Sequence, residues 1–461
     1  MTPDLKPYSQ YKDSGVPWLG KVPEHWQVLP GRACFWERKV SNKGMQEITV
    51  LSLSYGQIIV KPVEKLHGLV PESFETYQIV DPGDIIIRPT DLQNDWNSLR
   101  FGISHHKGII TSAYMCFKTR ELLAKEFGHL LLHTYDLKKI FYGLGSGLRQ
   151  NMDWRDFKYL PCLVPPLSEQ IAIVRFLDYT DRRIQRYIRA KQKLIKLLNE
   201  QKQAVIQQAV IRGLDPTVRL KPSGVEWLGD VPEHWEISRV KNEFTSLNRQ
   251  RVPLSGTQRG TMTLRIYDYY GASGVIDKVD DYIFNDELLL IAEDGANLVL
   301  RNLPLAIIAR GKFWVNNHAH ILKPRRGNLH FLASLMEGII YLPWISGAAQ
   351  PKLTQDRLMS ISICVPPPRE QDLIAQWIDN ETSPLINAIE QARKEIALFK
   401  EYRTRLIADV VTGKLDVRAA AARLPNELEE LEAVEDEEEE TMPEDAVEAD
   451  PSELAVEEGE V

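Results

Sequence analysis

A chain of 461 residues with 43% hydrophobic and 26% charged side chains has the composition of a globular protein, and its length predicts about three structural units. No apolar run approaches the ~18–20 residues of a membrane-spanning helix, and the first residues lack the apolar core of a secretory signal, so we expect a cytoplasmic protein. The four cysteines, Cys34, Cys116, Cys162 and Cys364, stand far apart without a C-x-x-C pair. This spacing favours reduced, buried thiols over a zinc site or a disulfide framework, and we expect no bound metal.

The charge is distributed unevenly along the chain. The whole chain carries −8, but residues 426–461 contain 18 acidic side chains and no Lys or Arg, so residues 1–425 carry +10. Like-charge repulsion and sparse apolar content predict disorder over residues 424–461. A basic body is typical of a protein that binds nucleic acid. The acidic segment either serves solubility alone or competes with phosphates for the basic surfaces.

Two segments occur twice. SGVPWLGKVPEHW at residues 14–26 returns as SGVEWLGDVPEHW at residues 223–235, and PPLSEQ from Pro165 is matched by PPPREQ from Pro366. The repetition indicates two copies of one scaffold related by a two-fold axis, with residues 1–30 forming an amino-terminal scaffold segment. Because they lie in the repeated segments, we expect scaffold-packing roles for Trp18, Trp26, Trp227, Trp235, His25 and His234.

A long helix is expected after each proline pair, with predicted ranges 166–214 and 366–416, and the glycine near each end (Gly213, Gly413) is a stop signal. Alternating steps of four and three residues define a heptad seam in both helices. In the first helix the seam is Ile184, Ile188, Lys191, Ile195, Leu198, Lys202, Val205 and Ala209. In the second it is Leu385, Ile389, Ala392, Ile396, Phe399, Arg403, Leu406 and Val410.

The two seams are expected to pack against each other as an antiparallel coiled coil. Lys202 and Arg403 occupy equivalent seam positions, so a parallel pair would bring two positive charges together. The alternative is that each helix packs separately on its own domain. The chain's first residues also resemble the segment directly after the first long helix, so we expect them to lie near the end of the second.

Two α/β domains are predicted before the long helices, at residues 31–165 and 215–365. The expected strands are 48–54, 84–89, 108–117, 261–267, 287–293, 305–309 and 313–322. Helical segments are expected at 121–144 and 328–342. The order of parts is shared while the loops differ, which favours similar tasks on different targets.

Loops of both domains carry side chains that suit DNA, since Arg pairs with guanine edges, Asn and Gln with adenine edges, and Lys or Thr with phosphates. The candidate DNA-binding residues of the first domain are Arg88, Thr90, Gln93, Asn94, Asn97, Arg100 and Lys107. Those of the second domain are Arg249, Arg251, Gln258, Arg259, Arg265, Asn297 and Arg301. For any single one, a solvated surface role or a turn-capping role is the alternative.

The sequence has no phosphate loop, no dinucleotide fingerprint and no H-E-x-x-H, and we expect no catalytic residues. An enzymatic alternative is a nuclease that holds Mg²⁺ with the adjacent Glu293 and Asp294. Such an enzyme would cut DNA without an added subunit. A third hypothesis is a structural coiled-coil adaptor, whose behaviour would not depend on Arg88 or Arg259. The role of His318, beside Asn316 and Asn317, stays open.

Taken together, SGVPWLGKVPEHW, the two PPxxEQ motifs, GDIIIRPTDLQND and LLLIAEDGANL resemble the specificity subunits of type I restriction–modification enzymes, over residues 8–418. The resemblance implies two target recognition domains that each read half of an asymmetric DNA site, and a coiled coil that sets the gap. It also implies a non-catalytic chain that docks two modification subunits, which use S-adenosylmethionine, and through them restriction subunits, which use ATP and Mg²⁺. It assigns no base-contacting residue, and the acidic segment departs from the family pattern.

The length of the predicted helices fits this role. A seam of about 30 residues spans roughly 45 Å at ~1.5 Å per residue. One turn of B-DNA takes about 34–36 Å. Helices of this length are therefore sufficient to hold two DNA-reading domains on successive turns of one duplex.

Overall fold

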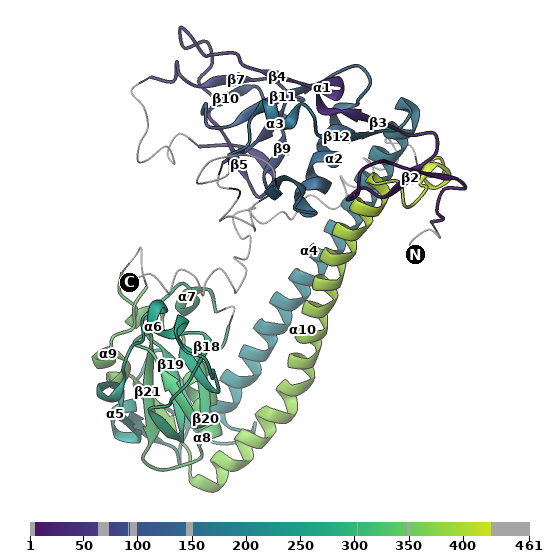
Figure 1. Cartoon of the computed structure of the whole chain (residues 1–461). Coiled ribbons are helices and arrows are strands. Elements are labelled where there is room, and N and C mark those ends of the chain that lie inside the picture. Colours follow the sequence, from purple (N-terminus) through teal and green to yellow (C-terminus); the bar gives the residue numbers. More distant parts are fainter. Residues whose placement is uncertain are drawn as a thin grey trace. The chain divides into compact units, whose positions relative to one another are not determined.

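The computed structural model describes residues 5–62, 73–90, 92, 99–143, 151–301, 303–347 and 351–425 (Figure 1). Its contacts divide the chain into two units: one holds the described residues of Met1–Ala190 and Glu395–Glu440, and the other those of Lys191–Lys394. No helix in the described ranges is both long enough and apolar enough to span a membrane. Of residues 424–461, for which we predict disorder, Leu424 and Pro425 are described and hydrogen-bonded to Arg175, and residues 426–461 lie outside the described residues.

Two long helices pass through both units. α4 (Leu167–Arg212) has 46 residues and α10 (Pro368–Val411) has 44, so both predicted helices are confirmed with slightly shorter ends. α10 contains Pro384, which removes one backbone donor from an otherwise continuous helix.

Contacts inside each unit show that the two helices run antiparallel as a coiled coil. In the first unit, Asp181 of α4 forms an ion pair with Arg403 of α10. One turn or more further along α4, the Tyr187 ring lies 4.6 Å from the Phe399 ring. The residue numbers rise along α4 and fall along α10, as expected for an antiparallel pair (Figure 1).

The second unit has the same arrangement at the other ends of the helices. Val210 near the end of α4 accepts a hydrogen bond of 3.2 Å from the thiol of Cys364, which lies just before α10. Val210 shares one buried cluster with Ile374 and Ile378 of α10. All sixteen predicted seam positions are buried or half-buried. Each helix also packs on its neighbouring domain, since Ile206 belongs to that same cluster.

Short strands and one main helix build the first domain. Its elements are β1 (Tyr11–Asp13), β2 (Lys21–Pro23), β3 (Gln27–Pro30), α1 (Gly31–Cys34), β4 (Phe35–Arg38), β5 (Leu51–Ser54), β6 (Gln57–Val60), β7 (Gln78–Val80), β8 (Ile85–Ile87), β9 (Phe101–Ile103), β10 (Gly108–Ile110), β11 (Met115–Thr119), α2 (Lys125–Leu137), η2 (Ile140–Gly143), α3 (Trp154–Phe157) and β12 (Pro161–Val164). An antiparallel sheet of order β4-β11-β8-β9 forms its centre. Because β8 is an all-apolar strand, it is buried on both faces, and α2 packs beside β9.

The second domain has a larger, mixed sheet of order β16-β21-β19-β20-β17-β18, in which β17 and β20 are parallel. Its elements are β13 (Leu220–Pro222), β14 (Asp230–Pro232), β15 (Glu236–Arg239), α5 (Val240–Glu243), β16 (Phe244–Ser246), η3 (Asn248–Gln250), α6 (Gly256–Gly260), β17 (Tyr267–Gly271), β18 (Gly274–Val279), β19 (Phe284–Ala292), α7 (Asn297–Leu300), β20 (Ala306–Val315), β21 (Ala319–Pro324), α8 (Leu329–Gly338), η4 (Leu342–Trp344), α9 (Gln355–Ser360) and β22 (Ser362–Val365). α11 (Arg418–Ala421) comes after α10.

Several expected strands have different bounds. The segment 261–267 is not a strand, because the chain forms α6 and a turn before β17 begins at Tyr267. The segment 108–117 is two strands separated by a turn. The segments 305–309 and 313–322 regroup into β20 and β21, and residues 316–318 form the turn between them. In the last two cases Ser112 or the Asn316–Asn317 pair interrupts the apolar run, and turn chemistry decides where the strand ends.

The repeated segments meet at a junction between each domain and its long helix. β3 pairs with β12, and β15 pairs with β22, so each VPEHW segment lies beside a PPxxEQ motif. At the first junction, the Glu169 carboxylate accepts a hydrogen bond of 3.0 Å from Trp26 Nε1 and lies 2.7 Å from His25 Nε2. The scaffold-packing role predicted for these two residues is confirmed there.

The glutamine of each PPxxEQ motif attaches the long helix to a helix of the domain. Gln170 Oε1 accepts from the backbone N–H of Ala124, the N-cap of α2, at 2.8 Å. Gln371 Oε1 accepts from the backbone N–H of Asn328, the N-cap of α8, at 2.9 Å. Both amides therefore satisfy a donor at a helix start that would otherwise lack a partner.

The chain's first described residues lie at the end of α10, as the repeat predicts. The backbone N–H of Asp416 donates to the Lys6 carbonyl at 2.8 Å. The Tyr11 hydroxyl donates to the Lys414 carbonyl at 3.2 Å, and the Arg418 guanidinium lies 5.2 Å from the centre of the Tyr8 ring. The first junction is thus assembled from both ends of the described chain.

Candidate nucleic-acid interface

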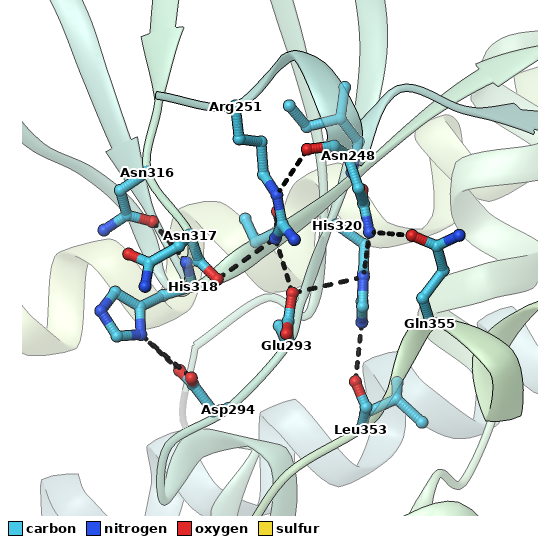
Figure 2. A network of polar contacts seen from close by, with 12 residues as sticks. Asn248, Arg251, Glu293, Asp294, Asn316, Asn317, His318, His320, Leu353 and Gln355 are labelled. Carbon is cyan, nitrogen blue, oxygen red and sulfur yellow. Dashed lines mark hydrogen bonds and ion pairs between the residues drawn. The ribbon is translucent and has the colours of Figure 1, made fainter. Parts of the chain in front are cut away.

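A polar network surrounds the turn between β20 and β21 in the second domain (Figure 2). β20 ends at Val315 and β21 begins at Ala319, which leaves a three-residue turn. The Asn316 side chain accepts from the backbone N–H of His318 at 2.8 Å, and the backbone N–H of Glu293 donates to the His318 carbonyl at 2.9 Å. The turn is therefore fixed from its own strand and from the end of β19.

Arg251 is one of the predicted DNA-binding residues, and the structure places its guanidinium inside this network (Figure 2). Nη1 lies 2.6 Å from Glu293 Oε2 and donates to the carbonyls of Asn317 and Ala319 at 3.2 and 2.8 Å. Its side chain is 16% exposed. Arg251 therefore holds the turn in place, and a base contact by its partly exposed guanidinium stays a prediction.

Behind Arg251, three side chains tie η3 to β21 and α9. Asn248 Nδ2 donates to His320 Nδ1 and to Gln355 Oε1, both at 2.8 Å. His320 Nε2 donates to the Leu353 carbonyl at 2.7 Å. Burial is the main cause that lowers the pKa of His320 below its ordinary value, and the nearby Glu293 carboxylate opposes this effect. The neutral ring fits its two contacts, one as acceptor and one as donor.

The exposed part of the turn is Asn317 together with His318. His318 Nδ1 lies 2.9 and 3.0 Å from the two carboxylate oxygens of Asp294, and its side chain is 22% exposed. An imidazole held through Nδ1 has its ring orientation set by that contact. The sequence alone did not assign a role to His318, and Asn317 was not among the predicted DNA-binding residues. The Asn-Asn pair between two apolar strands is the turn signal that identifies this position.

Another cluster of predicted residues gathers around Asp277 of β18. Arg259 Nη1 lies 3.2 Å from Asp277 Oδ2 and its guanidinium lies 5.0 Å from the centre of the Tyr269 ring. Arg265, whose side chain is 47% exposed, lies 3.3 Å from Asp277 Oδ1. Gln258 is exposed and completes a capping box with Ser255 at the start of α6. Of these three, Arg265 and Gln258 remain accessible to a ligand.

Asn297 and Arg301 serve the fold of the second domain. Asn297 exchanges two hydrogen bonds with the backbone of Leu303, at 3.1 and 2.9 Å, and is 9% exposed. Arg301 donates to the Ile339 carbonyl at 2.7 Å and to Gln203 Oε1 of α4 at 3.2 Å. Both side chains thus have internal partners, and the DNA contacts expected of them stay predictions.

In the first domain the predicted residues divide in the same way. Arg100 is 1% exposed, and its Nη1 donates to the Thr90 carbonyl at 2.6 Å, so it serves the fold rather than an exposed interface. Arg88 and Thr90 are half-buried, while Lys107 is exposed. The predicted residues Gln93, Asn94 and Asn97 lie outside the described residues. Arg249 of the second domain is exposed.

The carboxylates of the nuclease alternative already have protein partners. Glu293 lies within 2.6 Å of Arg251 Nη1, 3.4 Å of Lys352 Nζ and 3.5 Å of His320 Nδ1. Asp294 faces His318 instead, so the two carboxylates diverge (Figure 2). A shared cation would have to displace these cationic groups, which is unfavourable for a partly buried pair.

Comparisons with known proteins agree with this architecture. Residues 232–398 match the family model described as the type I restriction modification DNA specificity domain. A type I restriction enzyme specificity subunit of Haemophilus influenzae is 33% identical over 139 residues, which cover 30% of this chain and 34% of that protein. The MjaX specificity subunit of Methanocaldococcus jannaschii is 24% identical over 300 residues, which cover 62% of this chain and 67% of that protein.

A solved chain from a study of complex assembly and conformational transition in the type I R-M system shares the fold. Its TM-score is 0.58 at 14% identity, over 86% of this chain and 99% of that chain. The family model covers most of the second domain and most of α10, and the first domain repeats the same junction. The chain is therefore similar to the specificity subunits of type I restriction–modification systems, and residues 232–398 match the family's DNA specificity domain.

Proposed function

We propose that this chain gives a type I restriction–modification complex its DNA sequence specificity without being catalytic itself. Residues 31–165 and 215–365 each read one half of an asymmetric, two-part DNA site. α4 and α10 act as the spacer that sets the gap between the two halves. The observation that carries the proposal is the duplicated junction, where the same His–Glu and Gln–N-cap contacts attach two different sheets to one antiparallel helix pair.

The polar turn of the second domain supports this function. Arg251 and Asp294 keep Asn317 and His318 in one position, so little side-chain entropy is lost when DNA binds. Amide and imidazole groups suit the donor and acceptor pattern of the major groove. Exposed Arg249, together with half-exposed Lys352 beside the turn, suits phosphate contacts.

The partners and cofactors are those that the family implies. The chain docks two modification subunits, which bind S-adenosylmethionine and methylate adenine, and through them restriction subunits that use ATP and Mg²⁺. None of these small molecules is held by this chain. The chain and its partner subunits act in the cytoplasm, where their substrate is DNA.

Methylome sequencing of cells with and without this chain tests the proposal. We expect one methylated two-part sequence that disappears when the chain is deleted. Adding one heptad to both α4 and α10 at matched positions should widen the unread gap and leave both halves unchanged. A single contiguous methylated site, or a gap that ignores helix length, would contradict the spacer role.

The purified chain and its variants also distinguish the proposed function from the two rival functions, a nuclease and a structural adaptor. A nuclease would cut DNA with Mg²⁺ and no added subunit, and Glu293→Gln would abolish cutting. A structural adaptor would support methylation of the same sequence whatever stands at the exposed positions of the two domains. Loss or change of one half-site in domain variants is expected only for a DNA-reading subunit.

A further inference from the structure

The described chain ends beside a basic face of α4, at the point where the acidic segment begins. Arg175 Nη2 donates to the carbonyls of Leu424 and Pro425 at 3.2 and 2.8 Å. Residue 426 is the first of a stretch, 426–440, that contains ten acidic side chains and no Lys or Arg. The guanidinium of Arg175 thus fixes the position of the residues directly before this stretch.

A stripe of arginines continues along α4 from that point. At about 100° per residue, positions seven apart lie almost on one line of a helix, and positions four or three apart lie close to it. The stripe consists of Arg175, Arg182, Arg186 and Arg189. Arg182 and Arg189 are exposed and Arg186 is half-buried. Arg182 also pairs with Asp178 in its own helix.

A surface pocket joins the stripe to the start of the acidic stretch. It has a volume of about 250 Å³, and its lining contains the apolar Ile171, Val174, Leu424 and Pro425, two arginines (Arg175 and Arg182) and two carboxylates (Glu126 and Asp178). The pocket itself is therefore balanced in charge, and the excess positive charge lies further along the stripe. Ile171 is 58% exposed, so the pocket offers apolar surface next to the arginines. The acidic stretch carries Leu428 and Leu431 between its first glutamates, which suits such a pocket.

We propose that residues 426–440 dock along this stripe of α4 and shield it from nucleic-acid phosphates. The stripe from Arg175 to Arg189 is about 21 Å long, and fifteen residues reach up to about 50 Å when extended. Tethering at Pro425 gives the stretch a high effective concentration, so individually weak exposed ion pairs are sufficient. The shielding goes beyond the proposed function: it suppresses sequence-independent DNA binding by a strongly basic surface.

Zero-length cross-linking of the full-length chain tests where the stretch lies. Carbodiimide couples lysine amines to carboxylates, so Arg186→Lys and Arg189→Lys keep the charge and create reporters on the stripe. Arg405→Lys is the matched control, because Arg405 is 81% exposed on α10 and also has an i,i+4 acidic partner. We expect cross-links from residues 427–440 to positions 186 and 189 and none to 405. Equal coupling at all three positions, or none at 186 and 189, overturns the docking.

DNA binding tests the shielding. Deleting residues 426–461 should tighten binding to a random-sequence duplex by roughly tenfold at low salt and steepen the salt dependence by about three counterions. Adding Arg182→Ala, Arg186→Ala and Arg189→Ala to the deleted chain should reverse both changes. Unchanged affinity on deletion, or a tightening that the three substitutions leave in place, overturns the shielding. Circular dichroism confirms that each variant keeps its helices, and none of these outcomes depends on a two-part recognition site.

Discussion

His25 Nε2 lies 2.7 Å from Glu169 Oε2, and the second repeat reproduces this contact between His234 and Glu370 at 2.8 Å. The two junctions are nevertheless unequal. Glu169 is 3% exposed and also accepts from the Tyr8 hydroxyl and from Trp26 Nε1, whereas Glu370 is 29% exposed. The first junction is therefore closed by a residue, Tyr8, that precedes the repeated segment.

Because the two junctions differ in burial, we expect the same Glu→Ala substitution to lower the free energy of unfolding by different amounts at each. Glu169→Ala leaves the buried Tyr8 hydroxyl and Trp26 Nε1 without an acceptor, and each unpaired buried group costs about 1–3 kcal/mol. We expect Glu169→Ala to lower the free energy of unfolding by about 3 kcal/mol and Glu370→Ala by about 1 kcal/mol or less. Denaturant titration followed by tryptophan fluorescence measures both. Equal losses would show that Tyr8 contributes nothing to the first junction.

The seam pair of Asp181 and Arg403 predicts a charge-swap result. Both side chains are about one-third exposed, so the pair contributes about 1 kcal/mol. Asp181→Arg places two positive charges together and should lower the unfolding free energy, and adding Arg403→Asp should restore most of it. The control is Arg405→Asp, next to the seam on the same helix. No recovery in the double variant would contradict the antiparallel register.

Much of the scaffold is predictable from the sequence because its information is periodic or repeated. The steps of four and three place all sixteen seam residues correctly, and the like charges of Lys202 and Arg403 indicate the antiparallel sense. The partners of those two residues are not predictable from the heptad pattern. Arg403 forms an ion pair with Asp181, and the charge of Lys202 acts on Glu337 of the domain, where it partly offsets the rise in pKa that burial causes. Both relationships depend on the tertiary fold.

The candidate nucleic-acid interface was less predictable, because a loop arginine has the same kind of neighbours in the sequence whether its side chain is buried or exposed. Arg100, Arg251 and Arg301 donate mainly to backbone carbonyls, which are distant in sequence and leave no pattern in composition. Whether such an arginine is buried depends on which distant segments of the chain fold against it. Sequence composition therefore identified arginine-rich loops correctly and could not separate the arginines that shape a loop from those it presents.

Two histidines of α2 predict a pH dependence of stability. Burial lowers the pKa of His129 and of His133 from 6.5 to about 4, with a neighbouring positive group as the second cause in each. The folded state therefore binds fewer protons than the unfolded state between these values. The stabilising contribution is complete above pH 6.5 and is lost as the pH falls toward 4.

The expected loss between about pH 7 and 5 is about 1–2 kcal/mol for each histidine. Denaturant midpoints measured across this range should fall with pH in the natural chain and fall less in His129→Gln and His133→Gln. His106→Gln, at an exposed position, is the control and should keep the natural slope. A slope that is unchanged in both α2 variants would show that other groups carry the pH dependence.

The turn at Asn317 and His318 predicts a change in one half of the recognition sequence, given the proposed function. His318→Ala removes a side chain that Asp294 holds at the surface, while the turn keeps its support from Arg251. We expect methylome sequencing to show one position of one half-site relaxed by roughly tenfold, and the other half unchanged. Arg251→Ala should weaken the whole of that half-site, because it releases the turn itself. Lys278→Ala, exposed on β18, should leave the methylated sequence as it is. A natural chain with no two-part motif would contradict the proposed function, whereas an unchanged motif in His318→Ala would contradict only the role of this turn.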